Sequence, residues 1–485
     1  MPPTSSQSQQ PLNQENSLNV NGMSVSVTAL LLLGELTVGG AVALPRAVHT
    51  LGLPLGVVML FVFALITGFT GVALGSCWIM LQQLWPNVYL KHCQRPYQEI
   101  ARRAGGPKMS YFVIVCMSFS LLGRCVAYLI LAGHNFHWIF IDWFRLQIPF
   151  CILLVLVTVL VWPCTFLGSP KDFWYLILAA LTLTTLGTIL LVSGMFLDYQ
   201  EYSPNKLHVN PNPHNLTINL DTLNFTFHLT GEELMAIFMS MGVFLFSFTD
   251  HSTFPTIQQD MTHPRHWNRV LYLVYSVLLL YFLPVCVVAY VVYEEGVSEN
   301  IINNLHNKLI RSLVSFLVTC SVLLNFVLMI NPVCQQIECF LKIPHKFGKR
   351  RVLVRSCLVV FVMLVALAIP RFAALLSLVG GSVITFLAII LPSLFYLSLR
   401  VQLYKTIQDA NANYNSSDES CSSALLKSVR WGLLTALICI IAVSLVSVVG
   451  CTYSSLQEIG HSFGRPCYIR RIKHFGFMPA LNSTT

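Results

Sequence analysis

Apolar residues in this chain form long runs separated by short polar segments, without the alternation of a water-soluble domain. A helix that crosses the hydrocarbon core of a bilayer needs about 20 consecutive apolar residues, so each long run predicts one spanning helix. Eleven runs qualify, at residues 23–49, 53–81, 109–138, 148–168, 173–197, 232–257, 268–293, 309–341, 352–370, 373–399 and 428–452. The pattern predicts an all-α membrane protein with eleven transmembrane helices.

Composition excludes the main soluble classes. Hydrophobic residues make up 55% and charged residues 10% of the chain, whereas soluble domains carry about 25% charged residues. A net charge of +9 is divided among short loops, so we expect no nucleic-acid partner. The chain has no Walker loop, Gly-x-Ser-x-Gly or His-Glu-x-x-His motif, so we expect no enzyme, cofactor or metal site.

The polar segments leave no room for a second folded domain. Residues 1–22 are rich in Ser, Gln, Asn and Pro and lack the basic region of a signal peptide, so we expect a disordered cytosolic tail. No connection between spans exceeds the roughly 33 residues from Asp198 to Thr230, too few for an independent core. We therefore expect one transmembrane domain at 23–452 and a non-cytosolic tail at 453–485.

Basic residues predict which side of the membrane each loop faces, because cytosolic loops carry an excess of Lys and Arg. With a cytosolic N-terminus, eighteen of them fall in cytosolic loops and nine in non-cytosolic segments, four of those nine in the C-terminal tail. The basic tail leaves ten spans as an alternative. Three glycosylation acceptors, Asn215, Asn224 and Asn482, fall on the predicted non-cytosolic side, and Asn415 does not.

The fifteen cysteines do not predict a disulfide framework. Most lie inside apolar runs without metal-like spacing and are expected to pack as small hydrophobic residues. Cys451 and Cys467 flank a predicted non-cytosolic segment, so a disulfide between them is a hypothesis that a mass shift on reduction tests.

Two spans differ from plain hydrophobic helices, and they are five spans apart. Their unusual residues are Glu35, Gly39, Gly40 and Pro45 in the first, and Thr249, Asp250, His251 and Pro255 in the sixth. Secondary transporters are often two inverted five-helix repeats whose first helices break at the bilayer midplane, freeing peptide groups for a substrate. The alternative is that the glycines only allow close helix packing and the prolines only kink the helices.

These stretches carry a family resemblance. Residues 39–47, followed by Leu51-Gly52, resemble the first-helix motif of the amino acid/auxin permease family of amino acid transporters, and residues 248–264 resemble its sixth-helix signature. Asn331-Pro332 with Gln335, Gln336 and Glu338, and then residues 370–393, are similar to its eighth to tenth helices. The resemblance covers residues 23 to about 450.

The resemblance implies a LeuT-like fold of the APC superfamily. It implies a 5+5 inverted-repeat core, with repeats at 23–197 and 232–399, plus one extra C-terminal helix at 428–452. It also implies a cytosolic N-terminus and a non-cytosolic C-terminus. Sodium-coupled members carry an asparagine in the first helix, where this chain has Gly34-Glu35, so we expect the coupling ion to be H⁺ rather than Na⁺.

Buried carboxylates are the expected proton carriers, because burial and exposure to a water-filled vestibule change their proton affinity in opposite directions. Glu35 and Asp250 are the first candidates, followed by His251 and His49, since an imidazole titrates near neutrality. Two structural alternatives remain open: Glu35 pairs with Arg124, or His251 hydrogen-bonds a carbonyl. The substrate-binding candidates are Gly39, Gly40, Ala41, Phe248, Thr249 and Asn325.

The sequence thus favours a proton-coupled or exchange-type secondary transporter of small neutral amino acids that works by alternating access. We expect its partners to be the amino acid substrate and the lipid bilayer, and the functional unit to be a monomer. The alternative is a transporter-like amino acid sensor that signals through a partner. The sequence leaves open whether the home membrane is the plasma membrane or an endolysosomal or vesicular membrane.

Overall fold

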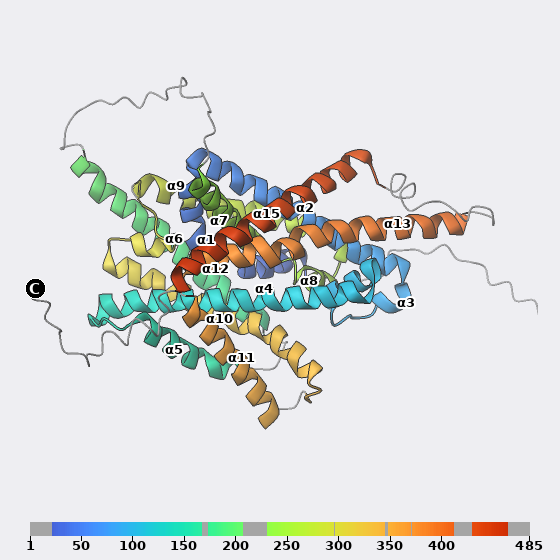
Figure 1. The fold of residues 1–485 in the computed structure, drawn as a ribbon, viewed down its shortest axis with the longest axis horizontal. Helices are drawn as coiled ribbons and strands as arrows, with labels where there is room; N and C mark the ends of the chain where they lie inside the picture. Colours follow the sequence, from blue (N-terminus) through green and yellow to red (C-terminus); the bar gives the residue numbers. More distant parts are fainter. Residues whose placement is uncertain are drawn as a thin grey trace, which may run out of the picture.

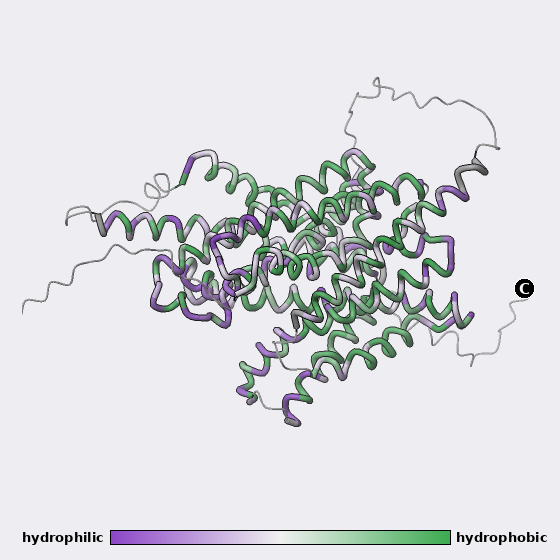
Figure 2. Tube along the Cα trace, turned by 180° about the vertical axis from the view of Figure 1, so that it is seen from behind, coloured by the Kyte–Doolittle hydropathy of each residue, from purple (hydrophilic) through white to green (hydrophobic). Residues whose placement is uncertain are grey.

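The computed structural model describes residues 22–166, 173–206, 230–294, 296–344, 348–369, 371–411 and 429–463. They form a bundle of helices that is apolar in its middle and polar toward its ends (Figure 1 and Figure 2). Ten helices in this part of the chain are long and apolar enough to cross a membrane. This confirms an all-α, multi-pass membrane protein. The segment expected at 148–168 is shorter than the others, so the eleventh crossing stays a prediction.

The helices follow the hydropathy pattern closely. The long elements are α1 (Val25–Leu51), α2 (Leu53–Leu84), α4 (Pro96–Phe144), α6 (Phe173–Lys206), α7 (Gly231–Phe248), α9 (Trp267–Val292), α10 (Lys308–Phe340), α11 (Lys349–Ala368), α12 (Phe372–Val379) continuing through η6 (Gly380–Ile384) and η7 (Phe386–Ile390) into α13 (Leu391–Asn411), and α15 (Trp431–Phe463). The short elements are α3 (Pro86–Tyr89), α5 (Phe150–Val161), η1 (Trp162–Phe166), α8 (Phe254–Gln259), η4 (Pro264–His266) and η5 (Ile301–Asn304).

Helix α1 is the most enclosed element of the bundle. It packs against α2, α6, α7, α9 and α10, and nearly all its residues from Thr28 to Val48 are buried. A helix surrounded in this way contacts protein rather than lipid, so small and polar residues are tolerated on it. This position explains how Glu35 is accommodated in the middle of a span.

The predicted break in the first span is wrong, because α1 is one continuous helix that includes Pro45. Its adjacent glycines serve close packing instead. A Cβ added at Gly39 would lie 2.8 Å from the Phe246 ring, and one at Gly40 would lie 2.6 Å from the Phe282 ring. The alternative interpretation, that the glycines admit a neighbouring helix, therefore holds for α1.

The sixth span breaks as predicted. Helix α7 ends at Phe248, and helical structure resumes only at Phe254, the first residue of α8. Pro255 lies in the first turn of α8, where a missing N–H costs no helical hydrogen bond. The five residues between the two helices therefore present backbone groups inside the bundle.

The last helix is longer than the sequence pattern predicts. The span expected to end at 452 continues to Phe463 in α15, so the boundary of a tail at 453 is wrong. Its serines satisfy their hydroxyls inside the bundle: Ser454 donates to the Gly450 carbonyl, and Ser455 donates to the Ser377 hydroxyl 2.9 Å away. Hydropathy undervalues such residues because it counts each hydroxyl as unsatisfied.

The prediction that Cys451 forms a disulfide is also wrong. Cys451 is a free, buried thiol that donates to the Phe238 carbonyl at 3.0 Å. Cys467 and the glycosylation candidates Asn215, Asn224 and Asn482 lie outside the described residues.

Cys151, at the beginning of α5, is disulfide-bonded. Disulfides persist in oxidising compartments, so this bond is consistent with a non-cytosolic α4–α5 connection.

A buried ion pair ties α4 to α10. The Arg311 guanidinium donates to both carboxylate oxygens of Asp142, at 2.9 and 2.5 Å, and its carbon lies 4.3 Å from the centre of the Trp138 ring. The Asp142 side chain is only 1% exposed. Removing one partner of a buried pair leaves the other charge uncompensated, so this contact is a sensitive point of the fold.

We therefore expect Asp142→Asn to lower the free energy of unfolding by about 3 kcal/mol, which is the usual scale for breaking a buried pair. Thermal unfolding in detergent micelles measures the change. The matched control is Arg102→Ala, which removes a half-exposed pair with Glu99 and should cost at most about 1 kcal/mol. Equal melting temperatures for the two variants would contradict the role assigned to the Asp142–Arg311 pair.

Candidate functional site

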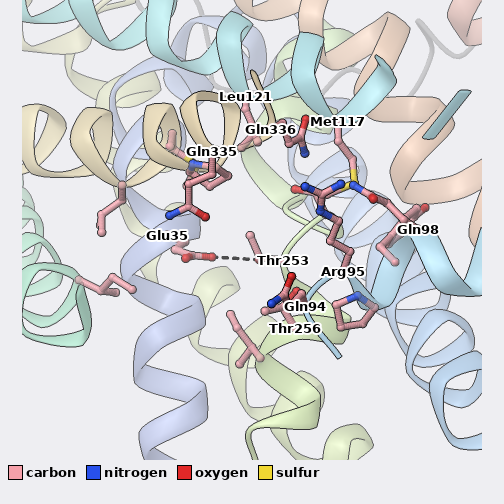
Figure 3. Close-up of a pocket in the computed structure, with 18 residues that line it drawn as sticks. Glu35, Gln94, Arg95, Gln98, Met117, Leu121, Thr253, Thr256, Gln335 and Gln336 are labelled. Carbon is pink, nitrogen blue, oxygen red and sulfur yellow. Dashed lines mark hydrogen bonds between the residues drawn. The ribbon is translucent and has the colours of Figure 1, made fainter. Parts of the chain in front are cut away.

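A cavity of about 360 Å³ lies between α1, α4, α8 and α10. Its polar lining consists of Glu35, Gln94, Arg95, Gln98, Ser252, Thr253, Thr256, Gln335 and Gln336, and Figure 3 shows most of these side chains arranged around one space. Gln94 and Arg95 precede α4, at the end of the bundle where α1 begins. With the predicted orientation, the cavity opens toward the cytosol.

Glu35 joins the cavity to the break between α7 and α8. The Thr253 hydroxyl lies 3.0 Å from Glu35 Oε2 and 3.0 Å from the Asp250 carbonyl oxygen, and Figure 3 shows the contact with Glu35. The charge of the Asp250 carboxyl also acts on Glu35. Because Thr253 has one proton to donate, it can serve only one of its two acceptors at a time.

Asp250 lies deeper than Glu35 and does not line the cavity. Its side chain is 2% exposed, and Ser252 donates a 2.9 Å hydrogen bond to Oδ1. The other oxygen, Oδ2, has no partner among the described residues. Two neighbouring buried carboxyl groups repel each other when both are ionised, so this pair is suited to hold and release a proton.

Arg124 does not pair with Glu35 in the way the structural alternative required. Its guanidinium donates to the Thr249 carbonyl oxygen at the end of α7, and its carbon lies 4.9 Å from the centre of the Phe246 ring. Its positive charge still acts on the Glu35 carboxyl. Arg124 therefore belongs to the broken region of α7 rather than to the cavity wall.

His251 points away from the cavity, toward α2. Its Nε2 lies 3.1 Å from the Thr67 carbonyl oxygen and 3.2 Å from the Thr70 hydroxyl, and its ring stacks on Phe254 at 4.5 Å. A nitrogen that faces a carbonyl must carry the proton and donate. The second structural alternative, a hydrogen bond from His251 to a carbonyl, is therefore the arrangement observed. His49 lies elsewhere, near the Glu294 carbonyl at the opposite end of α1.

None of the six predicted substrate-binding residues is among the described residues that line the cavity. Gly39, Gly40 and Ala41 are buried where α1 meets α7 and α9. Phe248 packs edge-on against Phe282 with ring centres 5.4 Å apart, and Thr249 forms the end of α7. Asn325 donates to the Ser321 carbonyl within its own helix.

Several lining residues were not among the predicted site residues. Gln335 and Gln336 follow Asn331-Pro332 by one helical turn, so helical spacing from that motif would have found them. Thr253 sits inside the sixth-helix signature, beside Asp250 and His251. Arg95 precedes α4 in a loop, and no local pattern indicates that this loop folds over the cavity.

The mouth of the cavity is held together by backbone contacts between distant segments. Met23 forms two backbone hydrogen bonds with the segment after α8. Its N–H donates to the Asp260 carbonyl at 2.8 Å, and its carbonyl accepts from the Thr262 N–H at 3.0 Å. The Gln259 side chain bonds both backbone groups of Cys93, at 3.1 and 2.8 Å. Burial raises the pKa of the Asp260 carboxyl, and His92 at 3.6 Å opposes that shift.

A multi-pass helical bundle with a one-sided polar cavity beside a broken helix is the arrangement of a membrane carrier for small solutes. Residues 21–414 match the family model described as transmembrane amino acid transporter protein. The chain belongs to this family, which confirms the resemblance drawn from the sequence motifs. The family is one of transporters, so the expectation that the chain is not an enzyme is also confirmed.

Relatives with curated descriptions carry matching names. Amino acid transporter AVT1B of Arabidopsis thaliana is 26% identical over 370 residues, which cover 74% of this chain and 62% of that protein. Amino acid transporter AVT3C of the same organism is 31% identical over 166 residues, 34% of this chain and 37% of that protein. The chain thus spans only about three fifths of the length of AVT1B.

Solved structures of other transporters show a weaker similarity. A crystal structure of MhsT in complex with L-phenylalanine has a TM-score of 0.49 at 12% identity and covers 88% of this chain and 99% of MhsT. A manganese transporter of Eremococcus coleocola has a TM-score of 0.46 at 13% identity and covers 91% of this chain and 97% of that protein. The inverted-repeat core therefore stays a prediction.

From the residues of α10 that line the cavity, we predict which engineered cysteines react with a water-soluble maleimide. We expect Gln335→Cys, in the cavity wall, to be modified, and Ser321→Cys, at a fully buried position of the same helix, to stay unmodified. Mass spectrometry of the two peptides from purified protein in detergent measures the difference. Equal modification of both positions would show that the solvent-filled space is not where the structure places it.

Proposed function

We propose that this protein is a secondary active transporter of small neutral amino acids, coupled to protons and working by alternating access. The observation that carries the proposal is the Thr253 hydroxyl, which lies within hydrogen-bond distance of both the Glu35 carboxylate and the Asp250 carbonyl. It joins a polar cavity, a helix break and a pair of buried carboxyl groups at one place. The family of the chain and the names of its relatives support an amino acid as the solute.

The size and chemistry of the cavity suit a small zwitterion. Its volume of about 360 Å³ lies at the small end of the range for small-molecule sites. The hydroxyls of Ser252 and Thr253, in the break between α7 and α8, line the cavity and would face the ammonium and carboxylate of the substrate. The apolar part of the lining, including Met117, Leu121 and Ile177, would face a short uncharged side chain.

Alternating access is supported by a second hollow at the opposite end of α1. This outer pocket, of about 490 Å³, is lined by Ala43, Arg46, Ala47 and residues of α7 and α15. Along α1, Glu35 faces the first cavity, the tightly packed Gly39 and Gly40 follow, and Ala43 faces the outer pocket. The packed layer of glycines against Phe246 and Phe282 is thus the barrier that a solute must cross.

The proton would be exchanged at Glu35, since this carboxyl lines the cavity and shares the Thr253 hydroxyl with Asp250. With Glu35 ionised, Thr253 donates to it. With Glu35 protonated, Thr253 is free to donate to the Asp250 carbonyl, its other acceptor. Protonation would in this way change the hydrogen bonding of the α7–α8 break, which is also the proposed substrate site. Proton and substrate binding are therefore coupled through one hydroxyl.

Purified protein in liposomes tests the proposal. We expect an imposed inward pH gradient to drive accumulation of a neutral amino acid in the parent protein, and Glu35→Gln to reduce that accumulation at least about tenfold, equivalent to about 1.4 kcal/mol. Exchange of labelled for unlabelled amino acid should persist, because glutamine can still accept from Thr253. Glu232→Gln, at an exposed position in the first turn of α7, is the matched control and should accumulate like the parent.

Three outcomes would count against the proposal. Accumulation driven by a sodium gradient alone would reassign the coupling ion, and unchanged accumulation in Glu35→Gln would remove the proton site. Binding of an amino acid by the parent without any movement across the membrane would favour the sensor alternative.

A further inference from the structure

A buried guanidinium lies at the α7–α8 break and has no part in the proton step described above. Arg124, on α4, is 3% exposed and donates to the carbonyl of Thr249, the residue that ends α7. Its Nε has no partner among the described residues. Burying a permanent charge this deeply costs free energy unless neighbouring groups compensate it. The position of Arg124 therefore needs a physical explanation.

The surroundings of Arg124 compensate a positive charge from several sides. Thr249 supplies a carbonyl oxygen at the negative end of the α7 dipole. The Phe246 ring presents its face to the guanidinium at 4.9 Å, a favourable contact for a cation. The unpaired Asp250 Oδ2 belongs to the next residue along the chain.

Carbonyl and carboxylate oxygens at an interrupted helix are the donors that bind a coupling metal cation in many carriers. Here a side chain of the protein brings the positive charge to those donors. We propose that Arg124 is a built-in cation, which takes the place of a bound metal ion at the α7–α8 break and makes transport independent of sodium. The inference rests on the proposed transport function and specifies how that function is coupled.

Charge balance supports the assignment. With one proton shared between Glu35 and Asp250, their single negative charge is balanced by Arg124, and the buried region is neutral. A metal cation in addition would leave an uncompensated positive charge, which is unfavourable inside the bundle. The arginine therefore supplies the positive charge of the site, and its removal should open a site for a free cation.

Arg124→Ala tests this inference in the same liposomes. We expect uptake in choline medium to fall at least about tenfold and to recover when guanidinium, sodium or lithium is added, while the parent responds to none of these ions. Arg124→Lys, which keeps the charge, should retain uptake without sodium. Glu35→Gln is the control for specificity, because added guanidinium should not restore its accumulation.

Cation-dependent thermal stability provides a readout that does not need transport. A cation that binds the folded Arg124→Ala protein should raise its melting temperature, whereas the parent should show no such rise. If Arg124→Ala does not elute as a monodisperse protein, Arg124→Gln replaces it in both measurements.

Two results would overturn the proposal that Arg124 is a built-in cation. One is uptake by Arg124→Ala equal to that of the parent, and the other is a folded Arg124→Ala protein that no cation rescues or stabilises. Failure of the parent itself to move an amino acid would instead overturn the proposed function. In that case the melting experiment still decides whether Arg124 occupies a cation site.

Discussion

Every backbone N–H and C=O inside a bilayer needs a partner from the protein, and this constraint explains the residues around the α7–α8 break. The Tyr275 hydroxyl donates to the Phe248 carbonyl at 3.0 Å, and Arg124 donates to the next carbonyl, that of Thr249. The Thr253 N–H then bonds the Asp250 carbonyl. Polar side chains from α4 and α9 thus satisfy what an unbroken helix would have satisfied itself.

Hydropathy predicted most of the fold, because membrane insertion depends on the local composition of each span. The interrupted sixth span could also be predicted, since Pro255 and its polar neighbours are visible in the sequence. The continuity of α1 could not, because it depends on Phe246 and Phe282 filling the space beside Gly39 and Gly40. A glycine pair that breaks a helix and one that admits an aromatic ring have the same local sequence.

The candidate site was predictable in kind but not in detail. A carboxylate within an apolar run indicates a functional position, and Glu35 does line the cavity. The partners of a buried polar group come from elsewhere in the chain, so the sequence could not show that His251 bonds α2 or that Arg124 contacts Thr249. Gly40, expected at the substrate, lies instead in the packed layer against Phe282, and Asn325 bonds the Ser321 carbonyl of its own helix.

The pairing of Met23 with the chain after α8 has a mechanical consequence. Met23 immediately precedes α1, and its two backbone bonds reach Asp260 and Thr262, just beyond α8. The first helix of the bundle and the short helix after the break are thereby joined to each other at one end of the bundle. An outward movement of either helix alone would break both of these hydrogen bonds, whereas a joint movement of the two would keep them.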